Sequence, residues 1–115
     1  MKSMSSSSLV VHTQRRQLEL YEDNRLIYRF PIAVGKNETP TPHGFFYIAA
    51  KAMYPGGVFG SRWMGLSLPQ YGIHGTNNPA SIGQAVSKGC IRMYNQDAEF
   101  VYQHVEIGTP VKIQS

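Results

Sequence analysis

Short segments rich in β-branched and aromatic residues, separated by clusters of turn-forming residues, are the feature that most restricts the fold of this sequence. The segments span 8–13, 16–22, 25–34, 45–50, 62–68, 71–75 and 109–113. Glycine, proline, asparagine and aspartate mark the stretches between them, and this punctuation is typical of a mostly β protein. The cluster at 22–24 predicts a hairpin between the second and third segments, and Pro31 predicts an edge position or a bulge in the third.

Two of these stretches carry more specific expectations. The segment FFYIAA at 45–50 is apolar throughout and predicts a buried strand. The stretch YPGGVFG at 54–60 predicts a glycine-rich loop, whose backbone can adopt positive φ or approach a ligand closely.

One helix is predicted, and it follows the cysteine. Asn95 is its expected N-cap and Gly108 its expected end, while the residues Ala98, Val101, Tyr102 and Val105 share one face. A chain of 115 residues, 42% of them hydrophobic, can bury one modest core. We therefore predict a small, mostly β domain, with a barrel-like or two-sheet body and one helix.

The N-terminal stretch MKSMSSSS has no apolar segment behind its lysine, so it does not resemble a secretory signal. We expect residues 1–8 to form a disordered leader and residues 9–115 to form one folded domain. No apolar run approaches the length that crosses a bilayer.

Composition excludes several kinds of site. A single cysteine rules out an internal disulfide, a multi-cysteine zinc site and a Cys-X-X-Cys redox pair. The net charge of +4 suits an anionic environment, such as an acidic cell-wall polymer. The basic residues are dispersed, however, and only Arg15 and Arg16 are adjacent, so nucleic-acid binding is not indicated.

The central part of the chain also lacks acid/base carboxylates, since none lies between Glu38 and Asp97. A glycosidase-type carboxylate pair, a metal-ligand cluster and a phosphate-binding Gly-Lys-Ser/Thr loop are all missing. What remains is a thiol and an imidazole, those of Cys90 and His74. An imidazole near a thiol can accept its proton for attack on a carbonyl, and backbone N–H groups of Gly89 and Cys90 would be suited to hold the resulting oxyanion.

The spacing of these two residues does not by itself establish catalysis. They lie sixteen positions apart (90 − 74), and glycines flank both, so sharp backbone turns are available. A lone cysteine is more commonly a small buried residue, and a histidine beside an apolar strand is commonly structural. Both interpretations remain open on spacing alone.

The stretch IHGTNNPASIG…AVSKGCIRMYN resembles the signature of the L,D-transpeptidase catalytic domain, or YkuD domain, whose members remodel bacterial peptidoglycan. FPIAVGKNETPTPHGFFYI at 30–48 and YPGGVFGSRWMGLSL at 54–68 are also similar to segments of that family, so the resemblance runs from about Leu9 to the C-terminus. Within the family, the chain is similar above all to the short enzymes of the cell wall or spore of Gram-positive bacteria.

The resemblance implies roles for particular residues. Cys90 would be the nucleophile and His74 its base, with the backbone carbonyl of Gly75 orienting the imidazole. Ser87 and Gly89 match the Ser/Thr-X-Gly-Cys motif, and Arg92 matches an arginine that many members carry two residues after the cysteine. These three residues would bind substrate. No metal or organic cofactor is implied.

Two positions depart from the pattern of many members. Lys88 stands where many have histidine, and a cation there would lower the thiol pKa or meet a substrate carboxylate. Arg92 stands where some have asparagine, and a structural role for it is as well supported as a substrate-binding one. Among other residues, Trp63 is expected in the core or a groove wall, and the histidines at 12, 43 and 104 are expected at the surface or as caps, without partners.

The activity implied by the resemblance is attack on a tetrapeptide stem after its diamino acid, release of the terminal D-alanine and transfer to an amine of a second stem. Water as acceptor would give L,D-carboxypeptidase activity. Another cell-wall cysteine peptidase and a non-catalytic wall-binding module are the alternatives. We expect a monomer that acts on peptidoglycan stem peptides in the cell wall or spore envelope, with no nucleic acid and no membrane span, and that is acylated by carbapenems.

Overall fold

The structure, a computed structural model, describes residues 6–115. Its strands are β1 (Ser7–His12), β2 (Gln17–Glu22), β3 (Arg25–Gly35), β4 (Gly44–Met53), β5 (Arg62–Leu66), β6 (Gly72–His74), β7 (Ala85–Ser87), β8 (Ile91–Met93) and β9 (Pro110–Gln114). The helix α1 spans Asn95–His104, and two short 3-10 turns, η1 (Gly57–Phe59) and η2 (Pro79–Ser81), lie in loops.

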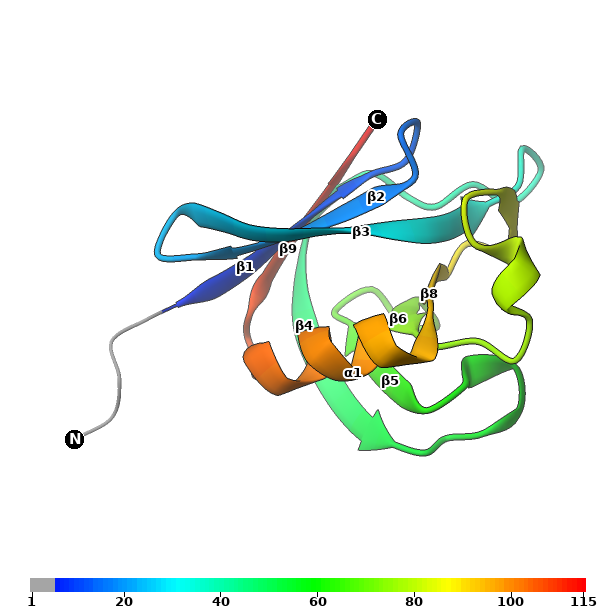
Figure 1. The fold of residues 1–115 in the computed structure, drawn as a ribbon. Helices are drawn as coiled ribbons and strands as arrows, with labels where there is room; N and C mark the ends of the chain where they lie inside the picture. The colour runs from blue at the N-terminus through cyan, green and yellow to red at the C-terminus, as the bar shows by residue number, and fades with distance from the viewer. Residues whose placement is uncertain (1–5) are drawn as a thin grey trace.

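The strands form a closed barrel, which is one of the two architectures that the sequence predicted, a barrel-like or a two-sheet body. Eight strands pair in the order β2-β1-β9-β4-β5-β6-β8-β3, and pairing of β2 with β3 closes the ring, while β7 adds to the outer end of β3. The single helix α1 lies beside the barrel (Figure 1). Apolar side chains of the strands and of one helix face fill the interior, including Leu9, Leu18, Ile32, Met64, Ile73, Ile91 and Val101.

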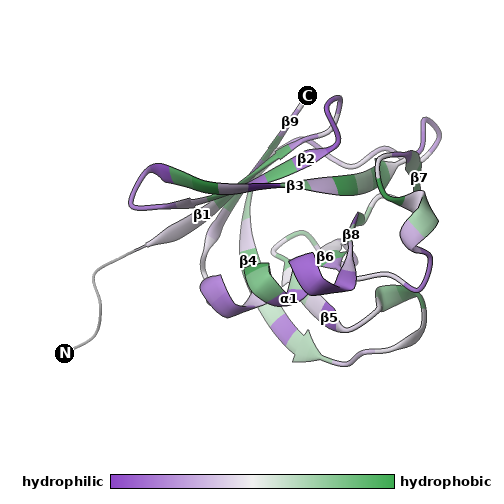
Figure 2. Cartoon of the chain, in the orientation of Figure 1, coloured by the Kyte–Doolittle hydropathy of each residue, from purple (hydrophilic) through white to green (hydrophobic). Residues whose placement is uncertain are grey.

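The β2–β3 hairpin forms where the sequence predicted it. Asp23 and Asn24 both have positive φ, 51° and 68°, as a two-residue hairpin turn requires. The hydrophilic tip of this hairpin stands out beside its apolar strands (Figure 2). The bulge, however, lies at Leu20/Tyr21 and not at Pro31. Pro31 instead marks the point where β3 leaves β2 and begins to pair with β8.

The prediction of a buried strand at 45–50 was wrong. Most of β4 is exposed, with Phe45 at 82% and Tyr47 at 52% exposure, whereas Ile48 is fully buried. The alternation of side chains along a strand sends Phe45 and Tyr47 to the outer face of the barrel, although their apolar character gave no sign of this.

The ends of α1 also differ from expectation. The N-cap is Tyr94, one residue before the expected Asn95, and the helix ends at His104 with Val105 as C-cap rather than at Gly108. Of the four residues predicted to share one face, Ala98, Val101 and Val105 are buried, and Tyr102 is partly buried against the core. Asn95 is displaced from the capping role because its side chain accepts hydrogen bonds from two loops instead.

The histidines expected to lack partners have them. His12 is 5% exposed and its Nε2 bonds Oε1 of the equally buried Glu19 at 2.8 Å. Burial alone would raise the pKa of Glu19, but hydrogen bonds from His12, Arg29 and Tyr21 lower it to about 2. His43 contacts the Thr13 hydroxyl, and His104 stacks on Phe100.

The leader expected over 1–8 is only partly described. β1 begins at Ser7, inside the expected leader, and residues 1–5 lie outside the described part of the chain. Within residues 6–115, no helix is both long enough and apolar enough to cross a membrane.

Candidate active site

Parallel pairing of two short strands brings the thiol and the imidazole to one place. β6 pairs with β8 so that Ile73 lies opposite Ile91 and His74 opposite Arg92. His74 ends β6, and Cys90 directly precedes β8. Both side chains line one hollow of about 470 Å³ at this edge of the barrel.

The histidine is buried and its tautomer is fixed by the backbone. His74 is 3% exposed, and its Nδ1–H donates to the carbonyl of Gly75 at 2.5 Å. The Gly75 carbonyl therefore lies where the family resemblance implied. With Nδ1 committed as a donor, Nε2 carries the lone pair that can accept a proton.

The environment of His74 keeps the imidazole neutral. Burial lowers its pKa, the bond to the Gly75 carbonyl partly opposes this, and the nearby charge of Arg92 adds to the lowering, so that the pKa lies at about 4. Rings pack on two sides: Trp63 lies nearly parallel with its centroid at 5.7 Å, and Phe59 meets the imidazole edge-on at 5.0 Å. A neutral histidine is the form that can act as a base.

The thiol is also in its neutral form. Cys90 is half-buried, and its Sγ–H donates to the carbonyl of Gln70 at 3.7 Å. Burial raises the thiol pKa, and a backbone hydrogen bond from Gly72 and the charge of Arg92 only partly oppose this. The neighbouring lysine was expected to lower the thiol pKa, and the structure gives the opposite net direction.

The turn before Cys90 is held by a buried serine. Ser87 is 3% exposed, and its hydroxyl donates to the Cys90 carbonyl at 2.6 Å and accepts from the Gly89 N–H at 3.0 Å. Gly89 has φ +125°, and a Cβ there would lie 2.5 Å from the ring of Tyr71. These two residues shape the turn through hydrogen bonds within the protein, and their expected contact with substrate stays a prediction. The Gly89 N–H is likewise not free for an oxyanion.

Sequence reasoning missed the two threonines of the Thr-Pro-Thr-Pro segment. The Thr41 hydroxyl donates to the Gly89 carbonyl and accepts from the Gly35 N–H, both at 2.9 Å. The Thr39 hydroxyl donates to the Ser87 carbonyl at 2.9 Å. The loop after β3 thus fastens the cysteine turn to the barrel. Hydroxyl residues alternating with prolines were the signal available in the sequence.

The glycine-rich loop at 54–60 borders the hollow, as expected. Val58 and Phe59 line it, and Phe59 is the residue that packs on the imidazole. Trp63 lines the same hollow and so belongs to the groove wall.

Asn95 ties this loop to the histidine strand. Its Oδ1 accepts from the N–H of Ser61 at 3.1 Å and from the N–H of Thr76 at 3.0 Å. A Cβ on Gly75 would overlap that oxygen, and so would a Cβ on Gly60. The glycine after His74 therefore leaves room for the Asn95 side chain.

This arrangement predicts energetic coupling between Asn95 and Gly75. We expect Asn95→Ala to lower the free energy of unfolding by about 1–2 kcal/mol, because two backbone donors lose their acceptor. Gly75→Ala should cost about 2 kcal/mol through overpacking against Oδ1. In the double variant the overlap with Asn95 Oδ1 is gone. The cost of the double variant should therefore be at least about 1 kcal/mol smaller than the sum of the two single costs. Urea unfolding measures all three; additive costs would contradict the tether.

Three cations line the hollow that holds the thiol. Lys36, Lys88 and Arg92 all line the hollow that holds Cys90, and Arg92 is half-buried. Of these, Lys36 was not expected at the site, because it is far from the cysteine in sequence. Among the described residues that line the hollow, none is Asp or Glu.

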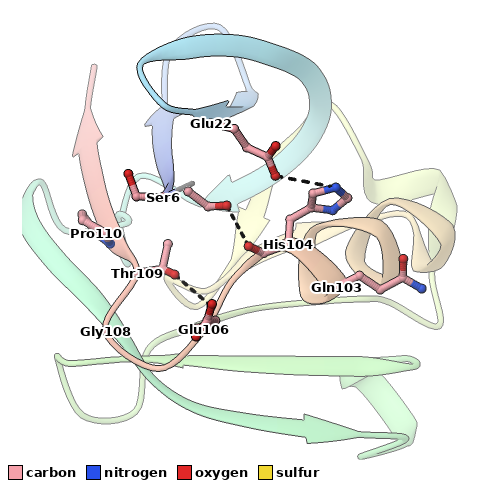
Figure 3. A pocket seen from close by; sticks show the side chains of 9 residues that line it. Ser6, Glu22, Gln103, His104, Glu106, Gly108, Thr109 and Pro110 are labelled. Atoms are coloured by element: carbon pink, nitrogen blue, oxygen red, sulfur yellow. Dashed lines mark hydrogen bonds and ion pairs between the residues drawn. The ribbon is translucent and has the colours of Figure 1, made fainter. Parts of the chain in front are cut away.

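A second hollow, of about 410 Å³, has the opposite character (Figure 3). It lies between β2, the end of α1 and the segment 106–110, and Glu22, Glu106 and His104 contribute to its lining. Glu22 lies 3.8 Å from His104, and the Thr109 hydroxyl accepts from the Glu106 N–H. It contains no thiol. No group of three His, Cys, Asp or Glu side chains suited to a metal ion occurs anywhere in residues 6–115.

Known proteins are similar to this chain in both sequence and fold. The YkuD relatives of Bacillus licheniformis and Bacillus subtilis are each 52% identical over 105 residues, which is 91% of this chain and 64% of theirs. The chain thus spans slightly less than two thirds of these relatives.

Solved structures of L,D-transpeptidases have the same fold as this chain. The catalytic domain of an Enterococcus faecium L,D-transpeptidase superposes with a TM-score of 0.81 at 25% identity, covering 98% of this chain and all of that one. L,D-transpeptidase 3 of Mycobacterium tuberculosis, in complex with a faropenem-derived adduct, superposes with a TM-score of 0.83 at 20% identity, covering 96% of this chain and 61% of that one. Residues 6–113 match the family model of the L,D-transpeptidase catalytic domain, YkuD. The chain belongs to this L,D-transpeptidase family.

Proposed function

We propose that this chain is a peptidoglycan L,D-transpeptidase that acts through a thioester on Cys90. The observation that carries the proposal is the state of the pair: a thiol and a neutral imidazole line one hollow, and Nδ1 of His74 is committed to the Gly75 carbonyl. Nε2 is thereby left as the proton acceptor. A non-catalytic wall-binding module would have no need of this fixed tautomer.

In the acylation half, Cys90 Sγ attacks the carbonyl carbon that links the diamino acid of a donor stem to its terminal D-alanine. The thiol proton passes to Nε2 of His74 as the S–C bond forms. The C–N bond then breaks, and the same proton goes to the departing amine of D-alanine. The product is a thioester and free D-alanine. Because both groups begin neutral, proton transfer accompanies attack rather than preceding it.

In the second half, an amine from an acceptor stem attacks the thioester. A C–N bond forms, the S–C bond breaks, and a proton from the amine returns through His74 to the sulfur. Water in place of the amine gives the hydrolysed stem, an L,D-carboxypeptidase side activity. Arg92 and Lys88 lie where they can meet carboxylates of the stem.

The place of action follows from the substrate. Peptidoglycan stems lie outside the membrane, so we propose the cell wall or spore envelope as the location and a monomer as the working form. Neither metal nor organic cofactor takes part in the steps above.

A turnover assay across pH tests the function. Folded protein given a tetrapeptide stem should release D-alanine and, with a second stem, form a crosslinked product detectable by mass. Since the pKa of His74 is lowered to about 4, the base is present at every pH above that value. We therefore expect kcat/KM to fall on the acid side only near pH 4, not near the ordinary imidazole value of about 6.5. Folded protein that yields neither product would refute the proposal.

The thiol has its own pH signature. Burial raises the pKa of Cys90, so iodoacetamide should alkylate it more slowly at neutral pH than it alkylates a free cysteine. The alkylation midpoint should lie above the ordinary thiol value. A midpoint below that value would mean that the resting site holds a thiolate and would change the first step.

A further inference from the structure

The hollow around Cys90 is the first of three neighbouring hollows, each of which shares a lining residue with the next. The next hollow, of about 230 Å³, lies between the β1–β2 turn and the loop after β3, and Lys36 lines both it and the Cys90 hollow. The third, of about 370 Å³, includes Arg15, Arg16 and Arg29, and Arg16 lines both it and the second. Shared lining residues therefore join the cysteine to the β1–β2 turn.

The series is cationic along its whole length. We call the cationic track the six residues Arg15, Arg16, Arg29, Lys36, Lys88 and Arg92 that line it. These make up six of the chain's eleven lysines and arginines. Among the described residues that line the three hollows there is no Asp or Glu. The hollow of Figure 3, by contrast, includes two glutamates in its lining.

One cation of the track, Arg16, has an N–H group that finds no acceptor within the described part of the chain. Glu19 accepts hydrogen bonds from Arg29 and His12, so the only charge of the track that it directly compensates is that of Arg29. Arg16 is half-buried, and its Nε is buried without a hydrogen-bond partner. A buried guanidinium donor without an acceptor is costly, and the planar guanidinium suits a carboxylate that approaches its outer N–H groups. The adjacent, exposed Arg15 adds a second charge there, and one of its N–H groups donates to Nδ1 of His12 at 3.2 Å.

We propose that the cationic track binds the free carboxylates of an extended, unamidated stem peptide, and so makes the enzyme selective for acidic over amidated stems. The inference rests on the proposed function, because it takes the ligand to be the donor or acceptor stem. Three of the six cations, Lys36, Lys88 and Arg92, line the Cys90 hollow itself, which favours anions carried by the substrate over those of a separate polymer. The two neighbouring hollows extend the cationic surface beyond the cysteine, as an extended peptide requires.

The test compares two synthetic stems of one sequence, with side carboxylates free or amidated, bound to Cys90→Ala protein and measured by calorimetry. The free-acid stem should bind more tightly, and added salt should weaken its binding more. Arg15→Gln with Arg16→Gln should weaken binding of the acid stem about threefold to tenfold, because two charge contacts are lost. Arg29 is left intact, since its removal would strip Glu19 of a partner.

The matched control removes the same charge elsewhere. Arg25→Gln with Lys112→Gln changes two exposed cations, neither of which lines the track. Arg25 begins β3 at the tip of the β2–β3 hairpin, and this hairpin points away from β8, the strand that follows Cys90 (Figure 1). This control should leave the preference for the acid stem unchanged.

The outcomes separate this proposal from the proposed function. Equal binding of the two stems, or equal effects of the Arg15/Arg16 and control variants, would overturn the track even if the wild type turns over stems. A clear preference for the acid stem in a protein that releases no D-alanine would sustain the track and refute the transpeptidase. If the Arg15/Arg16 variant loses affinity for inorganic tripolyphosphate but not for the acid stem, the hollows serve phosphate anions and the proposal fails.

Discussion

Incubation of the folded protein with a carbapenem is expected to add one drug mass, located by peptide mapping on the fragment that contains Cys90. The thiol would attack the strained lactam carbonyl, forming an S–C bond as the lactam C–N bond breaks, and the thiol proton would end on the lactam nitrogen. No atoms leave, so the mass gain equals the whole drug. The opened ring stays attached and obstructs the approach of an amine or water.

Substitution of either member of the pair should change this reaction greatly. Cys90→Ser should abolish the adduct or nearly so. His74→Ala should slow it by about 10²–10⁴-fold without moving it, since the proton acceptor is lost. His104→Ala is the matched control, because that histidine lies at the end of α1 and outside the Cys90 hollow. An adduct rate indifferent to His74 would remove the base from the mechanism.

The fold was predicted well where local pattern decides it. The β2–β3 hairpin follows from turn residues that tolerate positive φ, and the long strands begin and end within a few residues of their predicted limits. β7 and β8 were missed. Each has only three residues, and such strands form because neighbours pair with them, not because of their own propensity.

Burial was harder to predict than strand position. FFYIAA gave no sign that Phe45 would face outward, because an unbroken apolar run hides which of its two faces meets the core. Asn95 was assigned to the helix cap for its local chemistry. Its partners, Ser61 and Thr76, are remote in sequence, and only the folded chain brings them together.

For the site, the resemblance pointed to Cys90, His74 and Gly75, while spacing alone left catalysis undecided. The parallel register of β6 and β8 places His74 near Cys90, and no local pattern encodes that register. Ser87 and Gly89 shape the turn before Cys90, a structural part that the motif alone did not indicate. The cationic track was not foreseen, since its members are spread from Arg15 to Arg92 and meet only after the barrel closes.

Gly35→Ala is expected to destabilise the protein by about 3–5 kcal/mol, a large share of the stability of a small domain. Gly35 ends β3 directly under the loop that fastens the cysteine turn. A Cβ there would overlap the Thr39 carbonyl oxygen and lie 2.7 Å from the Thr41 nitrogen and 2.8 Å from the Pro40 carbonyl carbon. These are all backbone atoms, so no side-chain rotation relieves the overlap. The loop must move, and the hydrogen bonds of Thr39 and Thr41 move with it.

Gly108→Ala is the matched control, because Gly108 has φ +99° but no atom lies within 4 Å of the place that an added Cβ would take. Backbone strain alone should cost that variant about 1 kcal/mol. Urea unfolding of both variants separates crowding from strain. The loop tether has a further consequence: in Gly35→Ala protein that remains folded, the turn before Cys90 loses its anchor, so the carbapenem adduct should form more slowly than in Gly108→Ala protein. Equal stabilities of the two variants would show that the loop after β3 yields freely and does not hold the cysteine in place.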